Sequence, residues 1–182
     1  MGDLLMNVHN RERLKRVQRY GVSLRRLSKF LFALAAFSGA ATVLLLVFGE
    51  RENTSLLFGG IEYPADTVPL QAVAIAIATV VLGVGLLLKL FFHMIRLFDL
   101  YSLGVIFAVE NVRQLRQIGV TVLLFGILWF FQLLAQLMLP AGVREINLGR
   151  LFSILILGSV IVFFSWVMDV GRELREDHDL VV

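Results

Sequence analysis

The sequence predicts an all-α membrane protein, a four-helix transmembrane bundle with interfacial amphipathic helices. Two observations support this fold class. First, 58% of the 182 residues are hydrophobic and the mean hydropathy is +0.83, above the roughly 45 to 50% apolar content of soluble domains. Second, four segments are long and apolar enough to cross a hydrocarbon core of about 30 Å, which takes about 20 helical residues.

The four expected spans cover residues 30–49, 70–90, 118–139 and 151–168. None has an ionisable residue near its centre, so each can cross as a helix that satisfies its own backbone. The first span is longer than the apolar core of a secretory signal, and it is expected to be an uncleaved anchor. The chain then divides into a basic arm (1–29), a transmembrane domain (30–168) and an acidic tail (169–182).

The distribution of basic residues predicts the orientation. Thirteen of the 17 Lys and Arg residues fall in the arm, in the connection between the second and third spans, or in the tail, and Lys89 lies at the end of the second span beside that connection. Only Arg51, Arg144 and Arg150 fall in the other two connections. Because cytoplasmic loops collect Lys and Arg, both termini are expected in the cytoplasm.

The composition predicts no catalytic, cofactor or metal site. The chain has no cysteine, which excludes disulfides, thiolate metal ligands and cysteine nucleophiles. His9, His93 and His178 are too scattered for a haem or metal site. A weak metal site around His178 is conceivable, but a solvated tail is favoured. With a formal charge of +3, direct nucleic-acid binding is not expected. We therefore expect a non-enzymatic protein without a cofactor.

The first outer connection, residues 50–69, is acidic. Its acidic residues are Glu50, Glu52, Glu62 and Asp66. They could bind a cation or another ligand. A solvated loop with turns at Gly59-Gly60 and Pro64 is the favoured interpretation.

Two glutamines, Gln132 and Gln136, lie four residues apart in the third span and therefore on one helix face. We expect them to make polar contacts within the bundle, which are worth about 1 kcal/mol each. They could instead line a path for a polar solute, in which case the chain would be a small transporter or permease subunit, and possible homo-oligomers would build the path.

The arm carries Leu14 and Val17 on one helical face with cations around them. Such a helix can lie on a bilayer with anionic headgroups, where each cation contributes about 1 kcal/mol. The alternative is that the arm only fixes the topology, since positive-inside anchoring selects the same residues.

An amphipathic helix is expected to run into the third span. Val112, Leu115 and Ile118 form its apolar face, and Arg113, Gln114, Arg116 and Gln117 its polar face. Arg113 and Arg116 are the candidate partner-docking residues on this helix. A helix that merely closes the loop would have the same pattern.

The tail supplies the other candidate docking residues, which are acidic: Glu173, Glu176, Asp177 and Asp179. They could engage a soluble partner, together with the apolar C-terminal residues. They could equally fold back on the basic arm of the same chain.

Phe107, the run Glu110–Gly119 and the tail Gly171–Val182 together resemble the bacterial membrane family catalogued as domain of unknown function 2975. Its members have the pattern Glu-Asn-Val-x-x-Leu-Arg-x-Ile-Gly before the third span, which this chain matches. Ala108 occupies a position where many members have Ser, Thr or Pro. The resemblance extends over nearly the whole chain from the first span onward and includes the four-span layout.

The resemblance implies a bacterial inner-membrane protein and no particular activity. It also suggests a partner, because members are often encoded beside a very small helix-turn-helix regulator. The leading hypothesis is therefore a regulatory or scaffolding membrane protein that engages a small cytoplasmic DNA-binding regulator.

Overall fold

The computed structural model describes residues 2–48, 55–58, 61–64, 70–105, 108–136 and 148–179. Its helices are α1 (Gly2–Phe48), α2 (Leu70–Ser102), α3 (Val109–Gln136) and α4 (Leu148–Asp179). All four are long and apolar enough to cross a membrane. The predicted fold class is confirmed.

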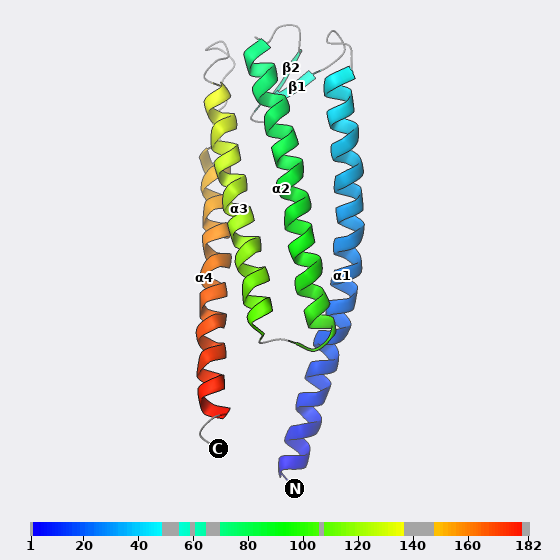
Figure 1. The fold of residues 1–182 in the computed structure, drawn as a ribbon, viewed down its shortest axis with the longest axis vertical. Coiled ribbons are helices and arrows are strands. Elements are labelled where there is room, and N and C mark those ends of the chain that lie inside the picture. The colour runs from blue at the N-terminus through cyan, green and yellow to red at the C-terminus, as the bar shows by residue number, and fades with distance from the viewer. Residues whose placement is uncertain are drawn as a thin grey trace.

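The helices run up and down in chain order, so that each packs against the next one (Figure 1). α1 begins and α4 ends at the same end of the bundle, together with the connection between α2 and α3. We call this the terminal end. The opposite end holds two short strands and is called the hairpin end.

The basic arm and the first span form one helix. α1 is 47 residues long and extends beyond the α2–α3 connection at the terminal end (Figure 1). The segment contains no proline to interrupt the helix. The amphipathic stretch before the third span is likewise the first part of α3. Both stretches therefore lengthen helices of the bundle.

The outer connection is more ordered than a solvated loop. β1 (Ser55–Phe58) and β2 (Ile61–Pro64) pair antiparallel, with Phe58 opposite Ile61. The physical reason is in the sequence, because two short runs rich in apolar residues flank a Gly-Gly pair, a favoured hairpin signal. The remainder of residues 50–69 lies outside the described residues.

Glycines set the closest helix contacts. A Cβ on Gly21 of α1 would lie 2.8 Å from the backbone nitrogen of Ser102 in α2. A Cβ on Gly119 of α3 would lie 2.7 Å from Val162 Cγ2 and 2.9 Å from its nitrogen in α4. Membrane helices approach this closely only where small residues remove the intervening side chains.

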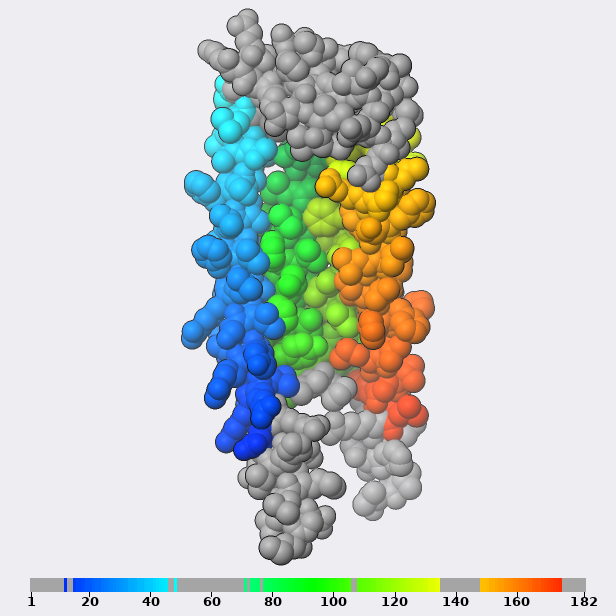
Figure 2. Space-filling model, turned by 180° about the vertical axis from the view of Figure 1, so that it is seen from behind, coloured from blue at the N-terminus to red at the C-terminus, as the bar shows by residue number. Residues whose placement is uncertain are grey.

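The bundle is open on one side. Seen from behind, α1 and α4 lie apart, and parts of α2 and α3 are visible between them (Figure 2). Within the described residues α1 and α4 make no extensive contact. Each outer helix therefore packs along one stripe, and its remaining apolar side chains face outward, as lipid-exposed helices do.

Candidate interaction surface at the terminal end

The turn that ends α2 has a defined hydrogen-bond pattern. The Gly104 N–H donates to the Tyr101 carbonyl at 3.0 Å, and the Val105 N–H donates to the Leu100 carbonyl at 3.0 Å. Gly104 has φ of 79°, a conformation that glycine adopts without strain. This pair of bonds is the Schellman motif, which satisfies the last carbonyls of a helix.

Asn111 connects this turn to α3. Its side chain is fully buried, at 0% exposure, and its Nδ2 donates to the Val105 carbonyl at 2.6 Å. A hydrogen bond of this kind contributes roughly 1 kcal/mol to stability. The bond therefore fixes the first turn of α3 against the end of α2.

A second polar contact joins α2 to α3. The Nδ1 of His93 lies 2.7 Å from Oε1 of Gln114, so the imidazole N–H donates to the amide oxygen. Gln114 is only 4% exposed. The prediction that Gln114 lies on the polar, outward face of its helix is therefore wrong. The physical reason is that α3 is covered by α2 on this side, where His93 supplies a partner for the amide.

An ion pair joins α1 to α2. A guanidinium nitrogen of Arg25 donates to a carboxylate oxygen of Asp99. The Ser102 hydroxyl donates to the Asp99 backbone carbonyl at 2.7 Å. Both charged side chains are partly exposed, so the pair contributes less than about 1 kcal/mol.

The predicted docking residues of α3 lie on the outer surface of the bundle, away from the hydrogen bonds and the ion pair that join α1, α2 and α3. Arg113 and Arg116 are exposed, and neither forms an ion pair with any residue that the structure describes. α2 and α3 also line a small polar hollow of about 180 Å³, with Arg96, Asp99, Leu100, Glu110 and Gln114, and neither Arg113 nor Arg116 lines it. Charged groups of both signs are thus available to a ligand or partner.

The tail continues α4 to Asp179. Arg172 pairs with Asp169 at 3.3 Å and lies 3.9 Å from Glu173, which is exposed. These contacts lie within one helix, and none joins the tail to the arm in the described part of the chain. The side chains of Glu176, Asp177 and Asp179 lie outside the described residues, so docking and self-pairing by these residues stay predictions.

The glutamine pair is only partly described. Gln132 is half-buried in α3, and the side chain of Gln136 lies outside the described residues. The polar side chains that are fully buried, Asn111, Thr121 and Ser165, each donate to a nearby backbone carbonyl. In the described residues these buried groups lie nearer the terminal end.

These features define a class, a multi-pass helical membrane protein with a polar, rigidly built surface at the terminal end. The family described as protein of unknown function, DUF2975, matches residues 46–182. The chain belongs to this family. The match begins near the end of the first span, so it excludes the arm. No match to a curated protein or to a solved structure was found.

The residues behind the family resemblance divide into two groups in the structure. Asn111, Val112, Ile118 and Gly119 are buried and hold α3 against its neighbours. Arg116 is exposed, and packing does not explain it. Sequence reasoning missed the contacts of His93, Asn111 and Gln114. The available signal was the spacing of Asn111, Gln114, Ile118 and Thr121, which places them on one face of a helix.

Proposed function

We propose that the protein is a non-enzymatic regulatory or scaffolding protein of the bacterial inner membrane, and that its cytoplasmic face binds a soluble partner. The observation that carries the proposal is the position of Arg113 and Arg116. Both are exposed and neither forms an ion pair with a described residue, although they belong to a helix start that buried hydrogen bonds hold in place.

This arrangement suits binding to a protein. Arg113 and Arg116 are three residues apart, so both project from one side of α3. A guanidinium is a common interface group because it binds carboxylates through two parallel hydrogen bonds. The hydrogen bonds of Asn111 and Gln114 hold the first turns of α3 in place, which reduces the entropy lost on binding. A partner with an acidic surface fits, and the family resemblance suggests a small helix-turn-helix regulator.

The proposal places the terminal end in the cytoplasm, because most Lys and Arg residues are there. The cysteine-free sequence allows a direct test. In intact cells a single cysteine at Ser23 should resist a membrane-impermeant maleimide, and one at Ser55 should react. The reverse labelling would contradict the orientation.

Partner binding is tested by cross-linking in intact cells, affinity purification and mass spectrometry. The double variant Arg113→Glu with Arg116→Glu should insert normally and lose the recovered soluble protein. Arg26→Glu is the matched control, since Arg26 is an exposed cation of α1 at the same end of the bundle. A chain truncated before Gly171 tests the acidic tail separately.

Equal recovery of the partner by wild type and by the double variant would contradict the proposal that Arg113 and Arg116 of α3 bind the partner. Recovery of nothing but the protein itself would sink partner binding as a whole. Solute flux in proteoliposomes would then test the alternative function as a small transporter. Absence of any flux would remove that function, and flux that survives replacement of both Gln132 and Gln136 by Leu would remove those two residues from the path.

A further inference from the structure

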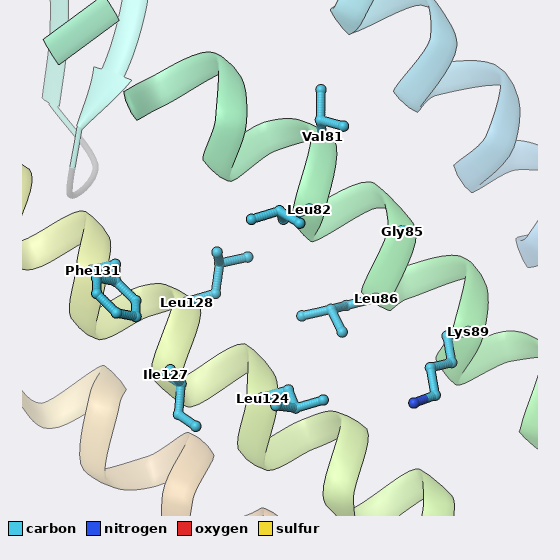
Figure 3. A pocket seen from close by; sticks show the side chains of 9 residues that line it. All are labelled: Val81, Leu82, Gly85, Leu86, Lys89, Leu124, Ile127, Leu128 and Phe131. Atoms are coloured by element: carbon cyan, nitrogen blue, oxygen red, sulfur yellow. The ribbon is translucent and has the colours of Figure 1, made fainter. Parts of the chain in front are cut away.

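The seam between α2 and α3 contains an apolar pocket of about 490 Å³. Its lining residues come from both helices; Leu82 and Leu86 point from α2 toward α3, and Leu124 points from α3 toward α2 (Figure 3). They include Leu82 and Leu86 of α2 and Leu124, Ile127 and Phe131 of α3. Gly85 leaves the α2 side open, because a Cβ there would meet no atom within 4 Å.

Lys89, an exposed residue, borders the pocket at the end nearer the terminal end of the bundle. Its side chain extends from α2 toward α3 (Figure 3). A lysine at a membrane boundary ordinarily extends outward along the helix to reach the headgroups. Lys89 forms no ion pair or hydrogen bond with any residue that the structure describes. An ammonium group beside an apolar pocket is suited to a ligand that combines an anionic group with an apolar chain.

Helix geometry places Lys89 at the level of lipid headgroups. The stretch from Leu70, where α2 begins, to Lys89 rises about 29 Å at 1.5 Å per residue, which is the thickness of the hydrocarbon core. The pocket itself runs from Val81 to Lys89, about 12 Å. One leaflet contributes about 15 Å of hydrocarbon, so the pocket fits one acyl chain in length and depth.

A second cation continues the line beyond Lys89. Arg96 lies seven residues further along α2 and therefore on the same face. Its guanidinium lies 4.6 Å from the centroid of the Phe92 ring, and it borders the polar hollow with Glu110 and Gln114. The apolar pocket, Lys89 and Arg96 thus follow one another along the seam, in the order of acyl chain, phosphate and outer headgroup.

A neighbouring pocket provides an internal comparison. The seam between α1 and α2 holds a pocket of nearly the same size, about 480 Å³, whose lining has no charged residue. It includes Ala40, Val43 and Leu88. Bulk lipid chains can cover such a pocket without any preference for a headgroup. The α2–α3 pocket differs in having Lys89 at its end.

We infer that the α2–α3 seam binds one anionic phospholipid from the leaflet at the terminal end, with an acyl chain in the pocket and its phosphate at Lys89. Basic pockets between membrane helices are suited to anionic headgroups. The site is separate from the proposed partner surface at Arg113 and Arg116, and it does not depend on which side of the membrane the terminal end faces.

The test is native mass spectrometry of the full chain in detergent, titrated with phosphatidylglycerol or with phosphatidylcholine of the same acyl chains. Wild type should bind one phosphatidylglycerol at least about fivefold more tightly than phosphatidylcholine, because the choline cation neutralises the phosphate of phosphatidylcholine, whereas each cation near the surface contributes about 1 kcal/mol to binding a headgroup of net negative charge. Lys89→Gln should remove most of this preference. Gly85→Leu should fill the pocket and weaken both lipids.

Two matched variants separate this site from general lipid contact. Lys29→Gln removes an exposed cation of α1, and Ala40→Leu adds apolar volume to the pocket that lacks a charge. Both should bind phosphatidylglycerol as wild type does. Helical circular dichroism and the thermal midpoint should confirm that all four variants fold. If Gly85→Leu does not fold, Lys89→Gln still tests the inference, because it adds no volume.

Equal affinity for the two lipids in wild type would overturn the inference, as would a preference that Lys89→Gln leaves unchanged. Loss of a dimer on Gly85→Leu, with lipid binding unaffected, would assign the pocket to a second copy of the chain and also overturn it.

Discussion

The α3–α4 interface and the α2–α3 seam are built in different ways. In the first, Gly119, Gly126 and Gly158 bring the helices together, and a Cβ on any of them would lie within 2.9 Å of a side chain on the other helix. In the second, the helices leave a pocket between Val81 and Lys89 and meet through His93 and Gln114 nearer the terminal end. Close packing at glycines joins α3 to α4, and a side-chain hydrogen bond joins α2 to α3.

The difference indicates that the bundle consists of two closely packed pairs, α1–α2 and α3–α4. α1 and α2 also meet through small residues, since a Cβ on Gly39 would lie 2.5 Å from Val84 Cγ1. The seam between the pairs holds the His93–Gln114 contact and the pocket that Lys89 borders. Packing thus stabilises the pairs, and the seam is left for binding.

The strongest test of this comparison is the same substitution at two glycines. Gly119→Leu should destabilise the protein by about 3 kcal/mol, because Val162 offers backbone as well as side chain as the obstacle. Gly85→Leu should stay within about 0.5 kcal/mol of wild type, because its side chain enters open space. Unfolding in mixed micelles measures both, and equal destabilisation would mean that the seam is as closely packed as α3–α4.

The α2–α3 turn gives the next largest effect. Asn111→Ala removes the hydrogen bond from a fully buried amide to the Val105 carbonyl and should cost about 0.5 to 1.5 kcal/mol. Hydrogen exchange should accelerate at the end of α2 and the first turn of α3, with the α3–α4 interface unchanged. Arg113→Ala, two residues away and exposed, is the control. Unchanged exchange in Asn111→Ala would show that the turn does not depend on this bond.

The amino-acid sequence predicted the fold well because the number, length and antiparallel order of the spans follow from hydropathy alone. The helix ends were harder to predict. The arm and the stretch before the third span contain many charges, yet both continue the helices α1 and α3, since nothing in either segment ends a helix.

The polar framework could not be predicted from single-helix patterns. Gln114 was assigned to a polar face because Arg113 and Arg116 adjoin it in sequence, but its environment depends on α2, which supplies His93. Arg25 and Asp99 are 74 residues apart, and their pairing follows only from the packing of α1 on α2. The exposure of Arg113 and Arg116 was predicted, since it depends on α3 alone.

The His93–Gln114 contact should have a modest energy. Interhelical hydrogen bonds in membrane proteins average about 0.6 kcal/mol in double-mutant cycles, with a maximum of about 1.7. We expect the cycle of His93→Phe and Gln114→Leu to give a coupling in that range. Thr121 supplies the control, because its hydroxyl bonds within α3, so His93→Phe with Thr121→Val should show no coupling. A coupling near zero for the first pair would leave shape alone to join the two helix pairs.

The smallest effect is expected at Arg25 and Asp99. Because both side chains are partly exposed, removing the pair with Arg25→Gln should cost about 0.2 to 1 kcal/mol, and the cost should shrink as salt is added. The charge swap Arg25→Asp with Asp99→Arg should recover part of the loss, and Arg26→Gln, a neighbouring exposed cation, should have no effect. A larger cost that does not change with salt would mean that this ion pair contributes as much to α1–α2 packing as the His93–Gln114 contact contributes to α2–α3 packing. The distinction between closely packed pairs and a polar seam would then be wrong.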